Sequence, residues 1–258
     1  MTPVTPVTDQ VAHDGGHVSG DGMPVVFLSG MLADQRMWQP ALAAYGDIEG
    51  AHRSISTVFC ELFEQDTIAD MARAVLDVAP KRFALVGMSM GGYVAFEILR
   101  RAPDRISHLM LVNTRATDDA PAIRRRRMLL AHLVAENTPF KGVNDAMLDD
   151  LIHPDNRNDD DLIRLLTEMA DACGPDVFKR QSKAVAERPD SLPVLADITV
   201  PCCVMVGEAD RVISPESHRD MANSITGASF VTVPGAGHYV PLETPDVFAR
   251  SLSDLLAR

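Results

Sequence analysis

A serine flanked by glycines stands in the first half of the chain, in the stretch Gly87-Met88-Ser89-Met90-Gly91. A run of apolar residues of strand length precedes it, and a helical pattern that opens with Gly91-Gly92 follows it. At such a strand-to-helix turn the serine backbone is strained, and small neighbours are required where strand and helix approach closely. An ordinary glycine-rich corner is the alternative. We predict that Ser89 is a nucleophile.

A nucleophilic serine needs a positioned base, because its hydroxyl alone is a weak nucleophile. His238 is the candidate, since the segment VPGAGHYVPLE places it in a glycine-containing loop after the last predicted strand. From such a loop an imidazole can reach across the edge of a sheet. The other histidines lie in the N-terminal segment, beside strands, in a helical block or on a predicted surface helix: His13, His17, His52, His108, His132, His153 and His218.

The base in turn needs an acid that fixes its tautomer and stabilises the imidazolium. In VMVGEADRVISP, Asp210 comes just after a predicted strand, and Glu208 is the second candidate, two residues nearer that strand. We favour Asp210 because the more distal carboxylate usually turns inward in this type of loop. An aspartate that merely begins a turn is the alternative. The order Ser89, Asp210, His238 matches the order found in sheets of this topology.

An acyl-transfer site also needs two backbone N–H donors for the oxyanion of the tetrahedral intermediate. Met90, directly after the nucleophile and at the positive end of its helix, is expected to supply one of them. The loop FLSGMLADQRMW should supply the other, with Met31 after Gly30 as the first choice and Leu32 as the second.

These residues need elements that hold them at one edge of a sheet. From residue 25 onward, strand-length apolar runs alternate with amphipathic helical segments, which predicts an α/β fold with a mostly parallel, doubly wound sheet. The expected strands are 25–29, 54–59, 83–87 and 106–113, and the strand pattern resumes within the stretches 201–210 and 228–238, whose ends carry Asp210 and His238. The expected helices include 38–45, 67–79 with Thr67 as N-cap, 91–102 and a last helix with Thr244 as N-cap. Only helical patterns occupy 117–190. We interpret them as a cap inserted within a single domain, 1–258, over the edge where such sheets bind ligands. Residues 1–22 are expected to be loose.

With these motifs in this order, the sequence resembles the α/β-hydrolase superfamily over residues 25 to 258. The stretch GMSMGGYVAFEILRRAPDRISHLMLVNT is especially similar to enol-lactonases and to small bacterial carboxylesterases of the capped type. The resemblance implies the α/β-hydrolase fold and the same triad. Two stretches differ from the family pattern: Ser29-Gly30 stands where many relatives carry His-Gly, and CELFEQDT replaces an Asp-x-x-Gly-x-Gly-x-Ser loop. A serine nucleophile excludes the haloalkane dehalogenase and epoxide hydrolase versions of this fold.

The expected reaction is cleavage of an ester, lactone or thioester of a small acyl substrate, with no metal or organic cofactor. C–C bond hydrolysis or cofactor-free perhydrolysis on the same triad is the alternative, followed by a non-catalytic binding module on this scaffold. Adaptable apolar side chains beside the chemistry predict the pocket, although many such residues simply pack under loops. They are Met31, Met37, Trp38, Met88, Met90 and Tyr239, and the expected substrate contacts add Leu32 and Arg115.

Four arginines, Arg124 to Arg127, form an unusual run in an acidic chain. Spread over a helical turn they cannot all face one way, so a solvated cap helix is the default interpretation. The sharper hypothesis is that one or two meet a substrate carboxylate, a CoA phosphate or an acidic carrier protein. Arg115, just after the strand 106–113, is better placed to reach into the pocket.

The bulk composition limits the function classes. The chain has 258 residues, of which 46 % are hydrophobic, and a formal net charge of −12. This charge argues against binding of nucleic acid and against attraction to anionic membranes. We expect no signal peptide and no membrane span. The four cysteines have no metal-ligand spacing and predict free thiols in a reducing cytoplasm. The sequence does not indicate the oligomeric state.

Overall fold

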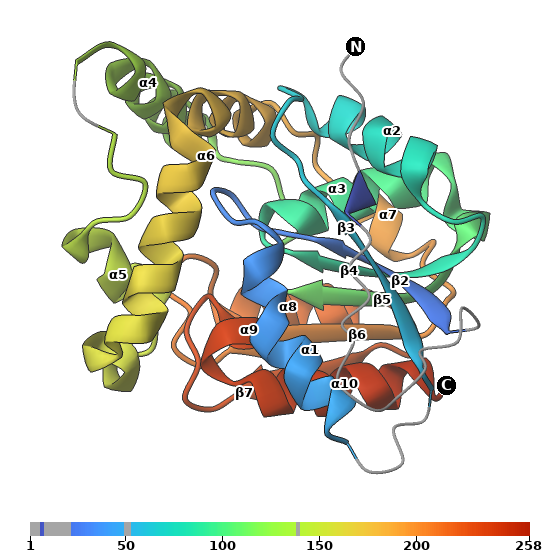
Figure 1. Cartoon of the computed structure of the whole chain (residues 1–258). Helices are drawn as coiled ribbons and strands as arrows, with labels where there is room; N and C mark the ends of the chain where they lie inside the picture. Colours follow the sequence, from blue (N-terminus) through green and yellow to red (C-terminus); the bar gives the residue numbers. More distant parts are fainter. Residues whose placement is uncertain (1–5, 8–21, 49–52, 138–139) are drawn as a thin grey trace.

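A seven-stranded sheet forms the centre of the computed structural model, which describes residues 6–7, 22–48, 53–137 and 140–258 (Figure 1). The strand order is β1-β3-β2-β4-β5-β6-β7. Strands β2 to β7 pair in parallel, whereas β1 pairs antiparallel with β3. The bounds are β1 Pro6–Val7, β2 Met23–Leu28, β3 Ile55–Cys60, β4 Phe83–Met88, β5 Ile106–Val112, β6 Cys202–Gly207 and β7 Ser229–Val233.

Helices cover both faces of this sheet, because its central strands are apolar on both sides. All six residues of β4 are buried. Along β5, Leu109 and Leu111 pack into the core under α2, α3, α7 and α8, whereas Met110 and Val112 pack into the core under α1 and α10. The sheet is therefore doubly wound, as the alternating pattern predicts.

Outside the cap, α1, α2 and α3 lie within one residue of the expected helices, and α10 begins directly after Thr244 as expected, whereas α7, α9 and the 3-10 turns were not predicted. The helical elements outside the cap are α1 Gln39–Gly46, preceded by the 3-10 turn η1 Gln35–Trp38, then α2 Ile68–Val78, α3 Met90–Arg101, the 3-10 turn η2 Pro103–Arg105, α7 Leu192–Leu195, α8 Pro215–Asn223, α9 Val240–Glu243 and α10 Pro245–Leu256. The Thr67 side chain accepts a hydrogen bond from Asp70 N, as expected of an N-cap. Thr244 also precedes its helix, but its hydroxyl donates to Val240 O, because α9 ends immediately before it.

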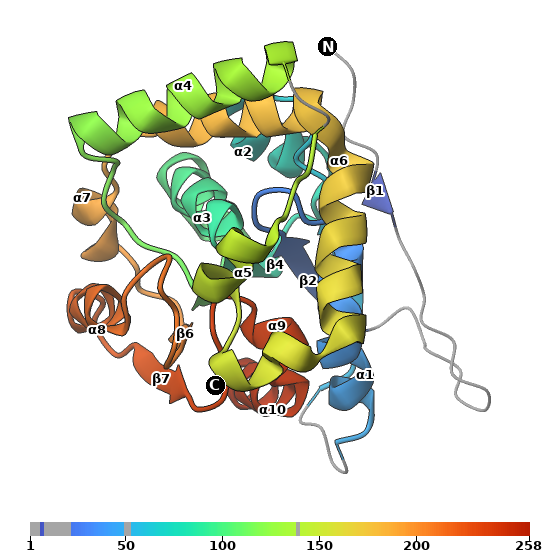
Figure 2. The same ribbon diagram turned by 90° about the vertical axis from the view of Figure 1, so that its left-hand side faces the viewer.

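The cap region consists of α4 Pro121–Asn137, α5 Asp145–Leu151, the 3-10 turn η3 Pro154–Asn158 and α6 Asp160–Ala186. Figure 1 shows α4, α5 and α6 on one side of the sheet, and Figure 2 looks directly at that side. Helix α6 is kinked at Gly174, whose φ of 74° lies in the left-handed region and which is followed by Pro175. The bend lets one long segment follow two sides of the cap. The extent 117–190 stays a prediction.

Little of the N-terminal segment 1–22 lies within the described residues. Pro6 and Val7 form β1 against Cys60 and Phe59, and Gly22 leads into β2. The prediction of a loose segment otherwise falls outside the described part of the chain. Within that part, no helix is long and apolar enough to cross a membrane.

Candidate active site

Ser89 occupies a strained turn between β4 and α3. Its φ of 52° and ψ of −114° fall in a region that serine rarely adopts. The turn is tight, since a Cβ on Gly91 would lie 2.0 Å from Leu28 O and a Cβ on Gly87 would lie 2.7 Å from Gly91 O. Two donors, Gly92 N at 3.0 Å and the Thr114 hydroxyl at 2.8 Å, bind the Ser89 carbonyl. The strain is therefore held by packing and hydrogen bonds on both sides.

The His238 ring lies between Ser89 and Asp210. Its Nδ1 is 2.9 Å from Asp210 Oδ2, and its Nε2 is 3.0 Å from Ser89 Oγ. A carboxylate only accepts hydrogen bonds, so Nδ1 carries the proton and Nε2 of the neutral ring accepts from the serine hydroxyl. This arrangement allows Nε2 to take the serine proton as a nucleophile forms.

Four donors surround the Asp210 carboxylate, which is buried. Oδ1 accepts from Val212 N at 2.8 Å and Ile213 N at 3.0 Å, and Oδ2 accepts from His238 and from Asn113 Nδ2. Burial acts to raise the pKa of Asp210, but the His238 ring and the hydrogen bonds outweigh it, so the pKa lies below its ordinary value. The carboxylate is thus held ionised.

Glu208, the second candidate for the acid, lies apart from this chain of hydrogen bonds. Its side chain accepts from Gly235 N at 2.8 Å, and His153 Nε2 is 3.7 Å away. The structure brings Asp210 to His238 and leaves Glu208 at the surface. Histidines 13, 17 and 52 lie outside the described residues, and His218 is fully buried rather than on the surface.

The loop after β2 approaches Ser89 closely. A Cβ on Gly30 would lie 3.4 Å from Ser89 Cβ. In the described part of the chain, neither Met31 N nor Met90 N donates a hydrogen bond, so both amides stay open. Leu32 N instead donates to Gln181 Oε1 of the cap at 2.9 Å, which removes the second-choice donor.

Ser29 stabilises this loop through two hydrogen bonds. Its Oγ accepts from Trp38 Nε1 at 2.9 Å and donates to Asp34 O at 3.3 Å. The Trp38 ring packs between Phe27 and Phe248. Trp38 was expected to contact substrate, and the structure places it fully buried below the loop instead.

Most of the other apolar residues predicted for the pocket also pack in the core. Met31 is the only one of the set that keeps intermediate exposure within the described chain. The hydrophobic effect explains why these side chains are buried and not exposed in a pocket, because apolar side chains next to a buried turn are covered by the sheet and helices. The buried ones are Leu32, Met37, Met88, Met90 and Tyr239, and Tyr239 still packs edge-on against the His238 ring at 5.8 Å.

Arg115 binds Asp119 rather than reaching freely into a pocket. In the arginine run only Arg127 turns toward the body of the protein, where it also binds Asp119 at 3.0 Å. Residues 124–126 are exposed. The run is thus divided between three solvated arginines and one inward-facing arginine.

Two residues that sequence reasoning missed hold the His238 region in place. Asn113, with a φ of 46°, donates from Nδ2 to Asp210 Oδ2 at 2.8 Å and to Gly237 O at 3.1 Å. Glu243 Oε1 accepts from the amides of Gly237 and Tyr239, which flank His238. The position of Asn113, directly after a strand of the parallel sheet, could have marked it as a candidate site residue. Nothing in the sequence spacing could have marked Glu243.

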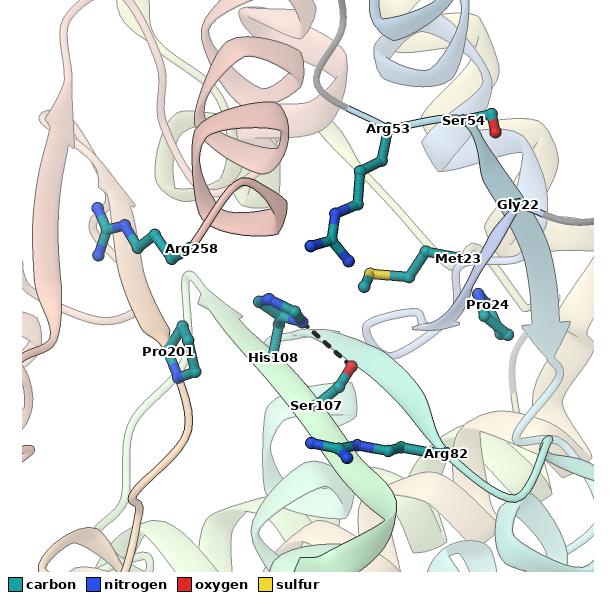
Figure 3. Close-up of a pocket in the computed structure, with 10 residues that line it drawn as sticks. All are labelled: Gly22, Met23, Pro24, Arg53, Ser54, Arg82, Ser107, His108, Pro201 and Arg258. Atoms are coloured by element: carbon teal, nitrogen blue, oxygen red, sulfur yellow. Dashed lines mark hydrogen bonds between the residues drawn. The ribbon is translucent and has the colours of Figure 1, made fainter.

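A separate cavity of about 860 Å³ opens at the opposite edge of the sheet (Figure 3). Its walls come from residues at or just before the starts of β2 to β6 and from the chain end: Gly22, Met23, Pro24, Arg53, Ser54, Arg82, Ser107, His108, Pro201 and Arg258. None of these is a predicted site residue. Among the described residues, no group of three or more His, Cys, Asp or Glu side chains gathers as a metal site.

Comparison with known proteins agrees with the fold and the family. A family model described as alpha/beta hydrolase family matches residues 12–251. A Mycobacterium tuberculosis protein provisionally named non-heme bromoperoxidase BpoC is 30% identical over 245 residues, covering 88% of this chain and 91% of that protein. An esterase from Thermogutta terrifontis has a TM-score of 0.82 and 28% identity, covering 92% and 90% of the two chains. The enol-lactonase from Burkholderia xenovorans LB400 has a TM-score of 0.79 and 22% identity, covering 99% and 96%. The chain belongs to the alpha/beta hydrolase family and is a hydrolase enzyme.

Proposed function

We propose that the protein is a serine hydrolase that cleaves a carboxylic ester, lactone or thioester through a covalent acyl-enzyme. Ser89 is the nucleophile, His238 the general base and acid, and Asp210 the group that orients and stabilises the imidazolium. The observation that carries this proposal is the unbroken chain of hydrogen bonds from Ser89 Oγ through His238 to Asp210 Oδ2. The three residues of this chain of hydrogen bonds come from three separate loops, after β4, β6 and β7.

In the proposed reaction Ser89 Oγ attacks the substrate carbonyl while His238 Nε2 takes the hydroxyl proton. The carbonyl oxygen becomes an oxyanion, and we expect it to accept hydrogen bonds from the amides of Met31 and Met90, which donate to no other group in the described part of the chain. His238 then gives its proton to the leaving alcohol or thiol, and the acyl group stays on Ser89. Water attacks the acyl-enzyme with His238 again as base, which releases the acid.

The cap is proposed to form the acyl pocket, because it donates and accepts hydrogen bonds at His238 and at the loops after β2 and β3. Leu151 O at the end of α5 accepts from His238 N at 2.8 Å. Gln181 of α6 bridges Leu32 N and Leu62 O. Met31, whose sulfur lies 3.8 Å from Arg127 Nη1 of the cap and which follows Gly30 next to Ser89, is the side chain that we expect to touch the substrate.

Hydrolysis of a series of p-nitrophenyl acyl esters by wild type and Ser89→Ala tests the proposal. We expect Ser89→Ala to lower kcat by about 10⁴-fold or more. A fluorophosphonate probe should label the wild type at Ser89 and leave Ser89→Ala unlabelled. Equal ester hydrolysis by the two proteins would contradict the assignment, and a wild type that resists the probe would point to a binding module.

Cofactor-free perhydrolysis is the second candidate, and the likeness to a protein named as a bromoperoxidase favours it over other non-ester reactions. The same acyl-enzyme would be attacked by hydrogen peroxide in place of water, giving a peracid. Peracid formation can be followed by bromination of monochlorodimedone in acetate, hydrogen peroxide and bromide. A Ser89-dependent rate far below that of ester hydrolysis would leave ester cleavage as the activity.

A further inference from the structure

Asp119 lies among three guanidinium groups at the base of the cap. Arg188 Nη2 donates to its Oδ1 at 2.9 Å, Arg115 Nη2 donates to the same oxygen, and Arg127 Nε donates to Oδ2 at 3.0 Å. The Asp119 side chain is completely buried. The three arginines come from the loop after β5, from α4 and from the segment after α6, so this cluster joins the cap to the body of the protein.

The cluster carries two more positive charges than negative ones. Arg188 is almost fully buried, whereas the side chains of Arg115 and Arg127 keep 22% and 28% exposure. The excess charge is therefore partly accessible to solvent through Arg115 and Arg127. Arg115 Nε is buried and has no acceptor in the described part of the chain. A planar guanidinium with free donors is well suited to a carboxylate or phosphate.

Each of the three arginines neighbours or contacts a residue close to Ser89 or to the proposed oxyanion donors. Arg115 follows Thr114, whose hydroxyl binds the Ser89 carbonyl. Arg127 Nη1 lies 3.8 Å from the sulfur of Met31, the proposed oxyanion donor. The Arg188 guanidinium lies over the Tyr93 ring, 4.2 Å from its centre. Tyr93 follows Ser89 by one turn of α3.

We propose that Arg115 and Arg127 bind a negatively charged group of the substrate, so that the enzyme selects acyl compounds that carry a carboxylate or phosphate. This inference rests on the proposed function of Ser89. Asp119 holds the two guanidinium groups in place without neutralising both. The exposed neighbours Arg124, Arg125 and Arg126 have no part in it, since they point to solvent on the same helix.

A pair of esters of similar length separates charge from shape: mono-4-nitrophenyl glutarate, which ends in a carboxylate, and 4-nitrophenyl pentanoate, which does not. We expect wild type to favour the charged ester. Arg127→Gln should lower the ratio of the two kcat/KM values by about 10-fold or more, because it removes a charge-assisted hydrogen bond. Arg125→Gln makes the same change of net charge on the outer face of α4 and should leave the ratio unchanged. The neutral ester reports any common effect of the substitution on folding or chemistry.

A second pair distinguishes the two sources of the anion. Pentanoyl-CoA carries phosphates on its leaving group, and the pentanoyl thioester of N-acetylcysteamine does not. Loss of selectivity in the glutarate pair assigns the cluster to a carboxylate on the acyl chain. Loss in the thioester pair assigns it to a phosphate on the leaving group.

Wild type alone offers a measurement that does not depend on how a variant folds. Raising the salt from about 0.02 to 0.5 M should reduce kcat/KM for the preferred charged substrate several-fold more than for its neutral partner, because mobile ions screen the attraction. An equal salt response for both partners, or an unchanged ratio in Arg127→Gln, would overturn the inference and leave the cluster as a support for the cap. If Ser89→Ala still hydrolyses every substrate, the proposed function fails instead.

Discussion

Asn113 donates from its side-chain amide to the same Asp210 oxygen that accepts from His238, at 2.8 Å and 2.9 Å respectively. Its Nδ2 also donates to Gly237 O, directly before His238. One amide group thus contacts the loop of the proposed acid and the loop of the proposed base. Its reach depends on a φ of 46°, which turns the chain as it leaves β5.

Asn113→Ala should lower kcat/KM for an ester by about 10-fold, because it removes a hydrogen bond to a buried carboxylate. Alanine is strained at positive φ, so Asn113→Gly, which is not, serves as the second variant. Both should lose similar activity. The exposed Asn223 at the end of α8 provides a control, since Asn223→Ala changes the same residue type without removing a hydrogen bond of the site. Wild-type activity in Asn113→Gly would show that the bond does not position the acid.

Asp210→Asn and Glu208→Gln together test which carboxylate serves the base. An amide at position 210 cannot hold His238 in the tautomer that accepts the serine proton. We therefore expect kcat to fall by about 10⁴-fold, as for the equivalent change in serine proteases. Glu208→Gln should keep nearly full activity, because its carboxylate contacts Gly235 N and not the His238 ring. Comparable losses in the two variants would contradict the assignment of Asp210.

The parts of the fold that follow from local pattern could be predicted. Buried strands such as β4 are continuous apolar runs, and the sheet with its two layers of helices agrees with the alternation of elements. Ser89, Asp210 and His238 could be selected because each follows a strand of a parallel sheet, and such strands end at one edge. The structure brings their side chains within hydrogen-bonding distance, while their catalytic roles stay predictions.

Side-chain direction could not be predicted where it depends on long-range contacts. Trp38 is buried because its indole N–H donates to Ser29 and its ring packs against Phe248, which lies more than 200 residues away in the chain. Glu243 accepts from backbone amides of two segments. Almost every residue carries such an amide, so the sequence does not show which ones a side chain will bind. Likewise, nothing in a run of four arginines shows that only Arg127 faces a buried aspartate.

Glu243→Gln should weaken the support of His238. The two carboxylate oxygens accept from four N–H groups: Gly237 N, Tyr239 N, His153 N and Asn156 Nδ2. A glutamine keeps one oxygen, and its NH₂ group would face two donors that then have no acceptor. We expect kcat to fall by about 10-fold and the protein to lose about 2 kcal/mol of stability. Glu216→Gln, on the exposed first turn of α8, is the matched control. Unchanged kcat in Glu243→Gln would remove this residue from the support of the site.

Asp119→Asn should destabilise the protein in a manner that depends on pH. Burial acts to raise the pKa of Asp119, but the hydrogen bond and charge of Arg188 and the charge of Arg127 outweigh it, so the pKa is lowered on folding. A carboxyl group with a lowered folded pKa stabilises the protein above its unfolded pKa of about 3.9, and this contribution is lost as the pH falls through the folded pKa.

At pH 7 we therefore expect Asp119→Asn to cost about 3 kcal/mol, because it leaves the buried Arg188 without its counter-charge. The difference from wild type, measured by urea unfolding, should be constant from pH 7 to about pH 5 and should shrink below about pH 4 as the wild-type carboxylate is protonated. Asp161→Asn breaks an exposed pair with Arg164 and should have little effect at either pH. A difference that is the same at pH 7 and pH 3 would mean that Asp119 acts through its shape and not through its charge.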